Sequence, residues 1–465
     1  MQKRRDFIKT FMSLAAASAG GAVLQGLPLS RALAADVSDY RALVCVFLFG
    51  GLDCHDTVLP IDEASYSSYS QLRESLLASY AAQPGGSSRA LANLLPLEPA
   101  RPSADGRRFA LPPELGALHS LFAEGKAAIV GNVGPLLQPT DRNGYLNGTA
   151  KLPARLFSHN DQQSTWMSFA PEGAQLGWAG RFGDAAVQSG ANTGSIFSQV
   201  SLAGNTVFLT GDLVSPYQIS ASGVPSIRLI DAVEQRFPSA VGGVMRDHFA
   251  AANAVTGNLL EQDFIDLSRV SLAANDTLEA ALGTGAGLST AFPASGLGAQ
   301  LQAVAQTIAV RESLGVRRQV FFVALGGFDT HSAQAAELPG LQQDVGEAIA
   351  AFYAATQELG VANAVTTFTA ADFGRTLTVN GDGTDHGWGG HQFVVGGAVK
   401  GGDIYGSIPP ATLGHSQDAG NGRLIPTTSV EQFAAPMGRW FGLNEAELAA
   451  ALPGLGGFPA APAFI

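Results

Sequence analysis

The chain has 465 residues, of which 14% are charged and 46% are hydrophobic, and its formal net charge is −12. The apolar content excludes an intrinsically disordered chain, and the acidic balance argues against a nucleic-acid partner, because phosphate binding needs concentrated Lys and Arg. Two cysteines in a chain of this length exclude a disulfide framework and a multi-cysteine zinc module. A large globular α/β protein and a membrane protein remain.

Residues 1–34 have the pattern of an export signal. Arg4-Arg5 precedes the tripeptide FIK at positions 7–9, a mildly apolar run follows, and the tripeptide ALA at 32–34 supplies a cleavage pattern. This arrangement resembles a twin-arginine signal, which implies export of the folded protein by the twin-arginine translocase to the periplasm or beyond. Removal of the signal takes away five basic residues and one acidic residue, so the net charge becomes −16. No other segment offers eighteen uninterrupted apolar residues, so the mature protein is expected to lack a transmembrane segment.

The rest of the chain alternates between strand and helix patterns. Short apolar runs bounded by Gly or polar turns predict strands at 43–49, 127–130, 207–209, 226–230, 320–325, 364–369 and 393–395. Helical periodicity predicts helices at 66–80, 113–124, 244–260, 264–281, 299–312 and 334–359. This alternation favours a mostly parallel α/β sheet with helices on both faces. We expect a single large domain over residues 35–465 with a mainly helical insertion around 231–298, in which the Gly-rich stretch 283–298 is the best linker candidate.

Two predicted strands end in the same polar motif. Residues 48–55 and residues 324–331 each consist of an apolar strand end followed by Gly-Gly-x-Asp-x-His. Ligands of open α/β sheets bind just beyond the carboxyl ends of the strands. If the two strands are neighbours, both Asp-x-His pairs should therefore project into one crevice.

Carboxylates and imidazoles near strand ends make up the candidate metal ligands. Asp372 lies just past the predicted strand at 364–369, and His386 lies in a polar loop. With the motif residues, the candidate ligands of one or two divalent ions are Asp53, Asp329, His331, Asp372 and His386. Mixed carboxylate and imidazole ligands suit zinc, manganese or iron, whereas carboxylates alone suit magnesium or calcium. Two metal ions about 4 Å apart can activate a nucleophile and neutralise a phosphoryl or sulfuryl oxygen.

The segment around Ser158 has two interpretations. In the first, Ser158 caps a short helix that carries Asp161 in its first turn. In the second, Ser158 is a nucleophile or His159 is a metal ligand. A helix N-terminus at this point would also stabilise an anionic substrate, and Arg375 could steady the same anion. Cys54 is interpreted as a packing residue, because no group that would activate a thiol is evident.

Five motifs occur in an order that resembles the exported bacterial family known as domain of unknown function 1501. They are Gly-Gly-Leu-Asp at 50–53, Ser158-His159 with Gln162 and Trp166, Gly-Gly-Phe-Asp-Thr-His at 326–331, Asp-Phe-Gly-Arg-Thr at 372–376 and Gly-Thr-Asp-His-Gly at 383–387. The chain departs from the family pattern with Cys54 and Asp56, where Gly and Asn are usual, and with Asp372, where Glu is common. The family is in turn similar to the alkaline phosphatase and sulfatase superfamily, whose α/β fold carries metal ligands at strand ends.

The resemblance implies a role for each candidate. Asp53 corresponds to the first-strand metal aspartate, Asp329 and His331 to the pair at one metal position, and Asp372 and His386 to ligands of the second. Ser158 is placed like the superfamily nucleophile.

The implied protein is an exported metal-dependent hydrolase of a small-molecule or polymeric phosphate or sulfate ester, in which Ser158 or water attacks. The sulfatase sequence Cys-x-Pro-x-Arg is absent, so Cys54 is not supported as a formylglycine precursor. A non-catalytic envelope or extracellular protein, which keeps the fold for binding or structure, is the alternative that the sequence leaves open.

Overall fold

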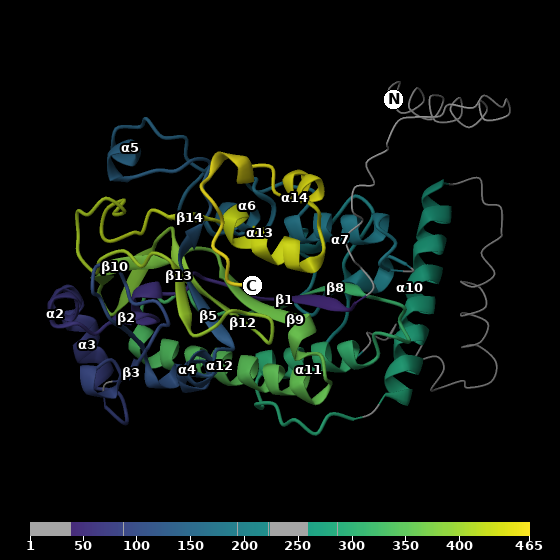
Figure 1. Ribbon diagram of the computed structural model, residues 1–465, viewed down its shortest axis with the longest axis horizontal. Coiled ribbons are helices and arrows are strands. Elements are labelled where there is room, and N and C mark those ends of the chain that lie inside the picture. The colour runs from purple at the N-terminus through teal and green to yellow at the C-terminus, as the bar shows by residue number, and fades with distance from the viewer. Residues whose placement is uncertain (1–38, 87, 193, 222, 224–258, 286) are drawn as a thin grey trace. The chain divides into compact units, whose positions relative to one another are not determined.

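The computed structural model describes residues 39–86, 88–192, 194–221, 223, 259–285 and 287–465 (Figure 1). These described residues belong to one compact unit. The predicted export signal, the predicted strand at 226–230 and the predicted helix at 244–260, apart from its last two residues, lie outside the described residues. None of the helices that are described is long and apolar enough to span a bilayer.

A nine-stranded sheet forms the centre of this unit. Its strand order is β13-β5-β12-β9-β1-β8-β6-β7, and β14 also pairs with β5. The strands are β1 (Arg41–Leu48), β5 (Ala127–Gly134), β6 (Gln199–Ser201), β7 (Tyr217–Gln218), β8 (Arg318–Leu325), β9 (Val365–Ala371), β12 (Gly390–Gly396), β13 (Asp403–Gly406) and β14 (Thr428–Ser429). Strand β12 is antiparallel to β5 and β9, and the other pairings within this sheet, among the described strands, are parallel.

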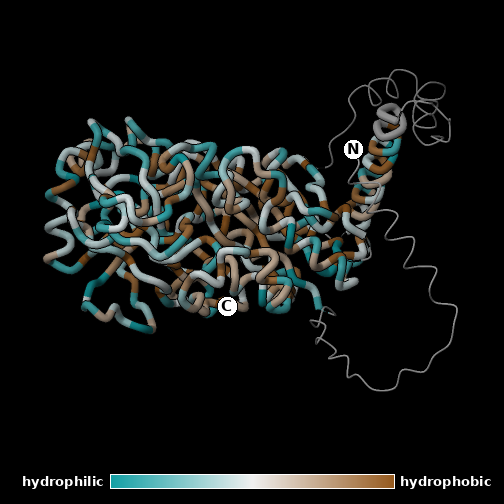
Figure 2. Tube along the Cα trace, turned by 90° about the horizontal axis from the view of Figure 1, so that it is seen from above, coloured by the Kyte–Doolittle hydropathy of each residue, from teal (hydrophilic) through white to brown (hydrophobic). Residues whose placement is uncertain are grey.

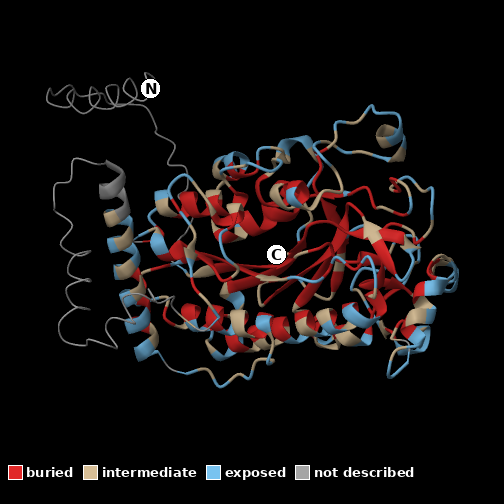
Figure 3. Ribbon diagram, turned by 180° about the vertical axis from the view of Figure 1, so that it is seen from behind, coloured by how far each residue is buried: buried red, intermediate tan, exposed pale blue. Residues whose placement is uncertain are grey.

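Helices cover both faces of the sheet. One layer contains α4 (Gly116–Ala123), α11 (Gly296–Ala309) and α12 (Gln334–Glu358), and the other contains α6 (His159–Ser168), α7 (Trp178–Gln188), α13 (Val430–Phe441) and α14 (Glu445–Ala451) (Figure 1). Alternate residues of β1 enter different cores, since Val44 and Val46 pack with the first layer while Leu43 and Phe47 pack with the second. The sheet is therefore buried on both sides (Figure 3). Hydrophobic segments are concentrated in the interior of the unit (Figure 2). The expectation of a mixed α/β fold with a mostly parallel sheet is confirmed.

Smaller elements surround the sheet. The remaining α-helices are α2 (Glu63–Leu72), α3 (Glu74–Ala81), α5 (Arg142–Leu146) and α10 (Leu259–Thr284). Strand β4 (Phe109–Leu111) pairs with β2 (Leu59–Pro60) and β3 (Leu95–Pro96), and β10 (Arg375–Asn380) forms an antiparallel pair with β11 (Gly383–His386). The β10–β11 pair is important for the site, because it aligns Arg375 with His386.

Five of the predicted strands are confirmed as β1, β5, β8, β9 and β12, but the strand predicted at 207–209 is wrong. These residues form a 3₁₀ helix, in which the Thr206 hydroxyl accepts a hydrogen bond from the Phe208 amide. Phe208 is buried edge-on against the ring of Trp178, with centroids 4.7 Å apart. The apolar residues at 207–209 are therefore buried by packing against α7, not by forming a strand of the sheet.

Two other predicted boundaries differ from the structure. The helix predicted at 66–80 is broken at Arg73, whose backbone leaves the helical region at φ −115° and ψ 21° while its side chain is buried. The linker proposed at 283–298 is partly helical, because α10 extends to Thr284 and α11 starts at Gly296.

Three parallel strands bring their carboxyl ends to one edge of the sheet. Strand β1 lies between β8 and β9, and Leu48 is in register with Leu325 on one side and Ala371 on the other. The two strands that carry the Gly-Gly-x-Asp-x-His motif are therefore neighbours, as the crevice hypothesis required. The loop that contains Asp372 starts beside them.

The glycines that follow these strands differ in how much space they need. Gly50 has φ +113°, and a Cβ there would collide with the backbone nitrogen of Asp329, whereas Gly326 has no positive φ and open space around it. We expect Gly50→Ala to lower the free energy of unfolding by about 2–4 kcal/mol, and Gly326→Ala to change it by less than about 1 kcal/mol. Urea unfolding of both variants measures this, and equal losses would contradict the interpretation.

Candidate metal centre

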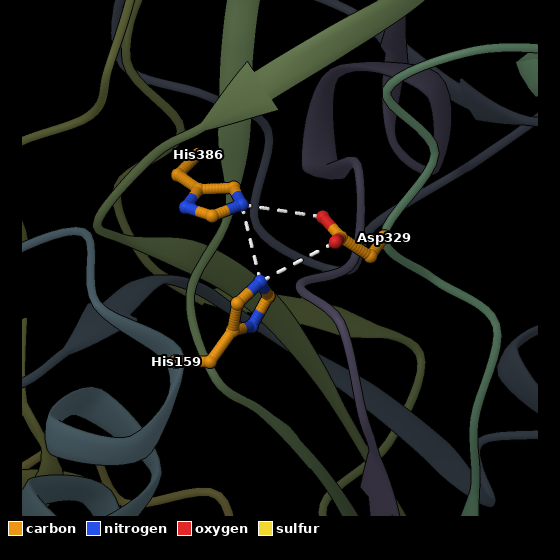
Figure 4. A group of neighbouring side chains, drawn as sticks. All are labelled: His159, Asp329 and His386. Carbon is orange, nitrogen blue, oxygen red and sulfur yellow. Dashed lines mark hydrogen bonds and ion pairs between the residues drawn. The ribbon is translucent and has the colours of Figure 1, made fainter.

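Three side chains from distant parts of the chain converge at this edge of the sheet. His159 is the first residue of α6, Asp329 follows β8, and His386 is the last residue of β11. One ligand atom from each lies within 4.8 Å of the other two (Figure 4). His386 Nε2 is 3.1 Å from His159 Nε2 and 3.2 Å from Asp329 Oδ1, and His159 Nε2 is 3.5 Å from Asp329 Oδ2. This set can hold a metal ion.

His331 adds a fourth donor to the same cluster. Its Nε2 atom is 2.8 Å from His386 Nε2 and 3.1 Å from Asp329 Oδ1. Asp329 and His331, which the resemblance assigns to one metal position, thus lie together, and His386, which it assigns with Asp372 to the second, lies in the same cluster with His159.

Each of the three imidazoles has an acceptor at its other nitrogen. His159 Nδ1 lies 2.6 Å from Asp372 Oδ2, and His386 Nδ1 lies 2.8 Å from the carbonyl oxygen of Phe157. His331 Nδ1 lies 3.3 Å from Asp385 Oδ1. Because these oxygens only accept, a neutral ring keeps its proton on Nδ1 and presents an Nε2 lone pair to the cluster. An acceptor that fixes the tautomer in this way is typical of metal-ligating histidines.

Converging lone pairs repel one another unless a proton or a metal ion lies between them. The hydrogen bond to Asp372 raises the pKa of His159, whereas partial burial, helped by the nearby His159 and Arg375, lowers the pKa of His386. A proton on His159 can therefore be shared with His386. A metal ion would satisfy all the donors at once, and the proton and the metal would compete for the same position.

Asp372 orients the imidazole of His159 from the buried side of the cluster. Its side chain is completely buried, and Oδ2 accepts hydrogen bonds from His159 and from Gln163 Nε2 at 2.8 Å. The other oxygen, Oδ1, is buried and has no hydrogen-bond partner among the described groups. The structure places Asp372 behind His159 rather than in the set of four converging donors, and it retains an orphaned oxygen that can take one more donor or cation.

The loop before α6 is strained in a way that serves the cluster. Arg155 and Phe157 have positive φ angles of 49° and 72°, which non-glycine residues seldom adopt. This turn aims the Phe157 carbonyl at His386. Ser158 occupies the N-cap position of α6, but its hydroxyl makes no capping bond and donates instead to Asp161 Oδ2 at 2.9 Å.

The ring of Phe373 forms an apolar wall of the site. Its centroid lies 4.8 Å from that of His159 and 4.7 Å from that of His386, and the residue is 2% exposed. A Cβ at Gly51 would collide with this ring, so the second glycine of the first motif makes room for it. The two imidazoles are therefore packed on one side and open on the other.

Asp53 is placed apart from the four converging donors. It caps the 3₁₀ helix Cys54–Asp56 by accepting from the His55 and Asp56 amides, and both its oxygens pair with the buried Arg73 guanidinium, at 2.6 and 3.0 Å. Gln334 Nε2 donates to it at 2.7 Å. These donors occupy the lone pairs of Asp53, which therefore belongs to a buried ion cluster with Arg73. The two Asp-x-His motifs do not share one crevice.

Arg375 is also occupied by the protein itself. Its side chain is completely buried, and Nη1 donates to Asp329 Oδ1 and to the Gly50 carbonyl, both at 2.9 Å. Partial burial tends to raise the pKa of Asp329, but the Arg375 guanidinium and the nearby imidazoles bring it below its ordinary value. Arg375 thus holds Asp329 rather than reaching outward to a substrate.

Cys54 and His55 lie in the core. Burial raises the pKa of the Cys54 thiol to about 12, which suits the packing role assigned from the sequence. Burial also keeps His55 uncharged by lowering its pKa to about 3, and its Nε2 lies 3.1 Å from the Gly422 carbonyl.

A cavity of about 650 Å³ lies elsewhere, between the loop 97–109 and residues 404–408, and none of the four converging residues lines it.

The sequence did not single out His159, Gln163 and Asp385 as parts of one centre. The sequence offers His159 as a ligand only as an alternative to a nucleophilic Ser158. No spacing links it to Asp329 or His386, which lie far along the chain, and only the contact of α6 with the strand ends reveals the connection. The sequence feature that could have indicated a functional role for His159 is the run of polar residues after Ser158.

The family comparison covers almost all of the described chain. Residues 40–454 match the family model described as a protein of unknown function, DUF1501. No curated protein matches the sequence. The matched region includes all the residues of the candidate centre. The chain therefore belongs to the DUF1501 family of proteins of unknown function.

Proposed function

We propose that the protein is a metal-dependent hydrolase that acts on a phosphate or sulfate ester. The observation that carries this proposal is the convergence of three imidazole Nε2 atoms and one carboxylate, each imidazole having an acceptor at Nδ1. A scaffold without a ligand has no use for four Lewis bases that face one another. The choice of ester follows from the resemblance of the ordered motifs to the alkaline phosphatase and sulfatase superfamily, which is itself part of the proposal.

The donor set favours a transition metal. Three nitrogen donors and one carboxylate suit zinc, and also manganese or iron, whereas magnesium and calcium prefer oxygen ligands throughout. His159, Asp329, His331 and His386 would hold the ion. When bound, it would polarise the ester oxygen and lower the pKa of a water molecule.

Individual side chains would have separate roles in the proposed reaction. Asp372 and the Phe157 carbonyl keep the imidazole lone pairs directed at the ion, and Phe373 excludes water from one side. Ser158 is the candidate nucleophile from the protein, since its hydroxyl proton is already directed at Asp161, which can accept it. Water is the other candidate nucleophile.

We also propose that the protein is exported folded by the twin-arginine route and acts in the periplasm or outside the cell. The leader pattern supports this location, and a metal loaded before export would be consistent with it.

Metal analysis followed by an ester panel tests the proposal. Protein purified without added ions should contain stoichiometric metal and hydrolyse one class among aryl phosphate monoesters, phosphate diesters and sulfate esters. Asp329→Asn should lower kcat/KM by at least about 100-fold, as expected when a ligand of a catalytic metal is lost, while the exposed Asp212→Asn should not. Ser158→Ala separates attack by serine from attack by water.

Other outcomes would contradict the proposal. Metal-free wild-type protein, whose melting temperature does not change with added zinc or manganese, would remove its basis. Stoichiometric metal without cleavage of any ester would favour a binding or structural protein that retains the fold.

A further inference from the structure

The metal ligand Asp329 depends on a contact with a buried guanidinium. It lies on a loop and is 44% exposed, so its own segment restrains it little. Among the described residues, the permanently charged group that touches it is Arg375, with Nη1 2.9 Å from Oδ1. The groups that orient the Arg375 guanidinium therefore also determine the position of the Asp329 carboxylate.

Thr384 fixes Arg375. The hydroxyl Oγ1 of Thr384 accepts from Arg375 Nε at 3.0 Å, and its carbonyl oxygen accepts from Nη2. The Gly50 carbonyl accepts from Nη1. Since the guanidinium is planar, holding Nε and Nη2 on Thr384 sets the direction in which Nη1 points. Thr384 is completely buried on β11, two residues before His386.

Gln334 fixes the direction of the Thr384 hydroxyl. Its Nε2 group donates to Asp53 Oδ2 at 2.7 Å and to Asp56 Oδ2 at 3.1 Å, which turns its Oε1 atom toward Thr384. The Thr384 hydroxyl donates to this Oε1 at 2.7 Å, so its lone pairs are left to face Arg375. The Arg73–Asp53 ion pair thereby sets the orientation of Gln334, and through it the orientation of Thr384 and then of Arg375.

We infer that Thr384 and Gln334 are positioning residues of the metal centre, which transmit the orientation of the buried Asp53–Arg73 pair through Arg375 to Asp329. This inference rests on the proposed metal site. It assigns to Asp53 and Arg375 an indirect role in metal binding, although neither faces the converging donors. The chain of hydrogen bonds runs Asp53, Gln334, Thr384, Arg375, Asp329.

Isosteric variants test the chain. Thr384→Val removes the hydroxyl at nearly constant volume, and Thr384→Ser restores it; Gln334→Met removes the amide. The matched control is Gln342→Met, because Gln342 is equally buried on α12 and bonds to Asp56 and Arg89 but has no contact with Thr384. The measurements are the zinc dissociation constant, by competition with a chromophoric chelator, and the visible spectrum of the cobalt-substituted protein.

Thr384→Val and Gln334→Met should weaken zinc binding about 10–100-fold, the range typical of lost outer-shell partners, and should shift the cobalt bands. Thr384→Ser should bind like the wild type. Gln342→Met should lower the melting temperature but leave the affinity and the spectrum unchanged. Wild-type affinity and spectrum in both Thr384→Val and Gln334→Met would overturn the inference.

A crystal structure of Thr384→Val separates this inference from the proposed function. If the wild type bound no metal, the proposed function would fail, yet the position of Asp329 would still decide the inference. Displacement of its carboxylate from Arg375 would support the positioning chain. An unchanged contact of 2.9 Å between Arg375 Nη1 and Asp329 Oδ1 would refute it.

Discussion

Replacing His159 by alanine is expected to abolish stoichiometric metal binding while the protein stays folded. His159 is partly exposed at the start of α6, so its loss removes little packing, but it takes one of the three converging Nε2 atoms. The affinity should fall by at least about 100-fold, since loss of an outer-shell partner alone costs 10–100-fold. Elemental analysis and calorimetric zinc titration of the purified variant measure the effect.

The matched control is His119→Ala. His119 is a partly exposed helical histidine on α4, and its Nε2 lies 2.8 Å from the Pro96 carbonyl. This variant should keep both metal content and affinity. Full metal content in His159→Ala would show that His159 is not a ligand, and equal loss in both variants would point to nonspecific histidine binding.

Replacing Arg73 by methionine is expected to destabilise the fold by about 3–5 kcal/mol, the cost of leaving buried charge without its partner. Arg73 is completely buried and pairs with Asp53 at 2.6 Å and with Asp56 at 3.0 Å. Burial opposes ionisation of Asp56, but the guanidinium groups of Arg73 and Arg89 hold its pKa below the ordinary value. The free energy of urea unfolding measures the loss.

An exposed pair serves as the control for Arg73. Arg439 is 45% exposed and pairs with Glu445, which is 73% exposed, so Arg439→Met should cost less than about 1 kcal/mol. Adding Asp53→Asn to Arg73→Met should recover part of the loss, because it neutralises the carboxylate that loses its guanidinium partner, whereas Asp56 keeps Arg89. An Arg73→Met loss no larger than that of Arg439→Met would show that the buried cluster does not stabilise the fold.

The strands were predictable because their signal is local. The runs that became β1, β8 and β9 are almost entirely Val, Leu, Phe, Ala and Thr between polar or Gly boundaries, and strands buried on both faces require this composition. The run at 207–209 has the same composition but became a 3₁₀ helix, since burial against α7 satisfies it equally well.

The break at Arg73 shows a different limit. The helical periodicity continues through residue 73, but the side chain leaves the helix pattern to pair with Asp53 and to donate to the carbonyls of Thr376 and Leu377. Asp53 lies 20 residues before Arg73, and Thr376 and Leu377 lie some 300 residues after it, so the periodicity around residue 73 does not contain the reason for the break.

The sequence by itself determined the mixed α/β class, the two glycine-rich strand ends and most of the residue types from which a metal centre can be built. Only the tertiary structure decided which of them meet. Asp53 and Asp329 occupy equivalent places in identical motifs, yet one is enclosed by Arg73 and Gln334 while the other faces His159 and His386. The difference arises because a carboxylate turns toward the side chains that neighbouring elements supply, and those side chains come from the break between α2 and α3, from α6, from α12 and from β11, all outside the motif.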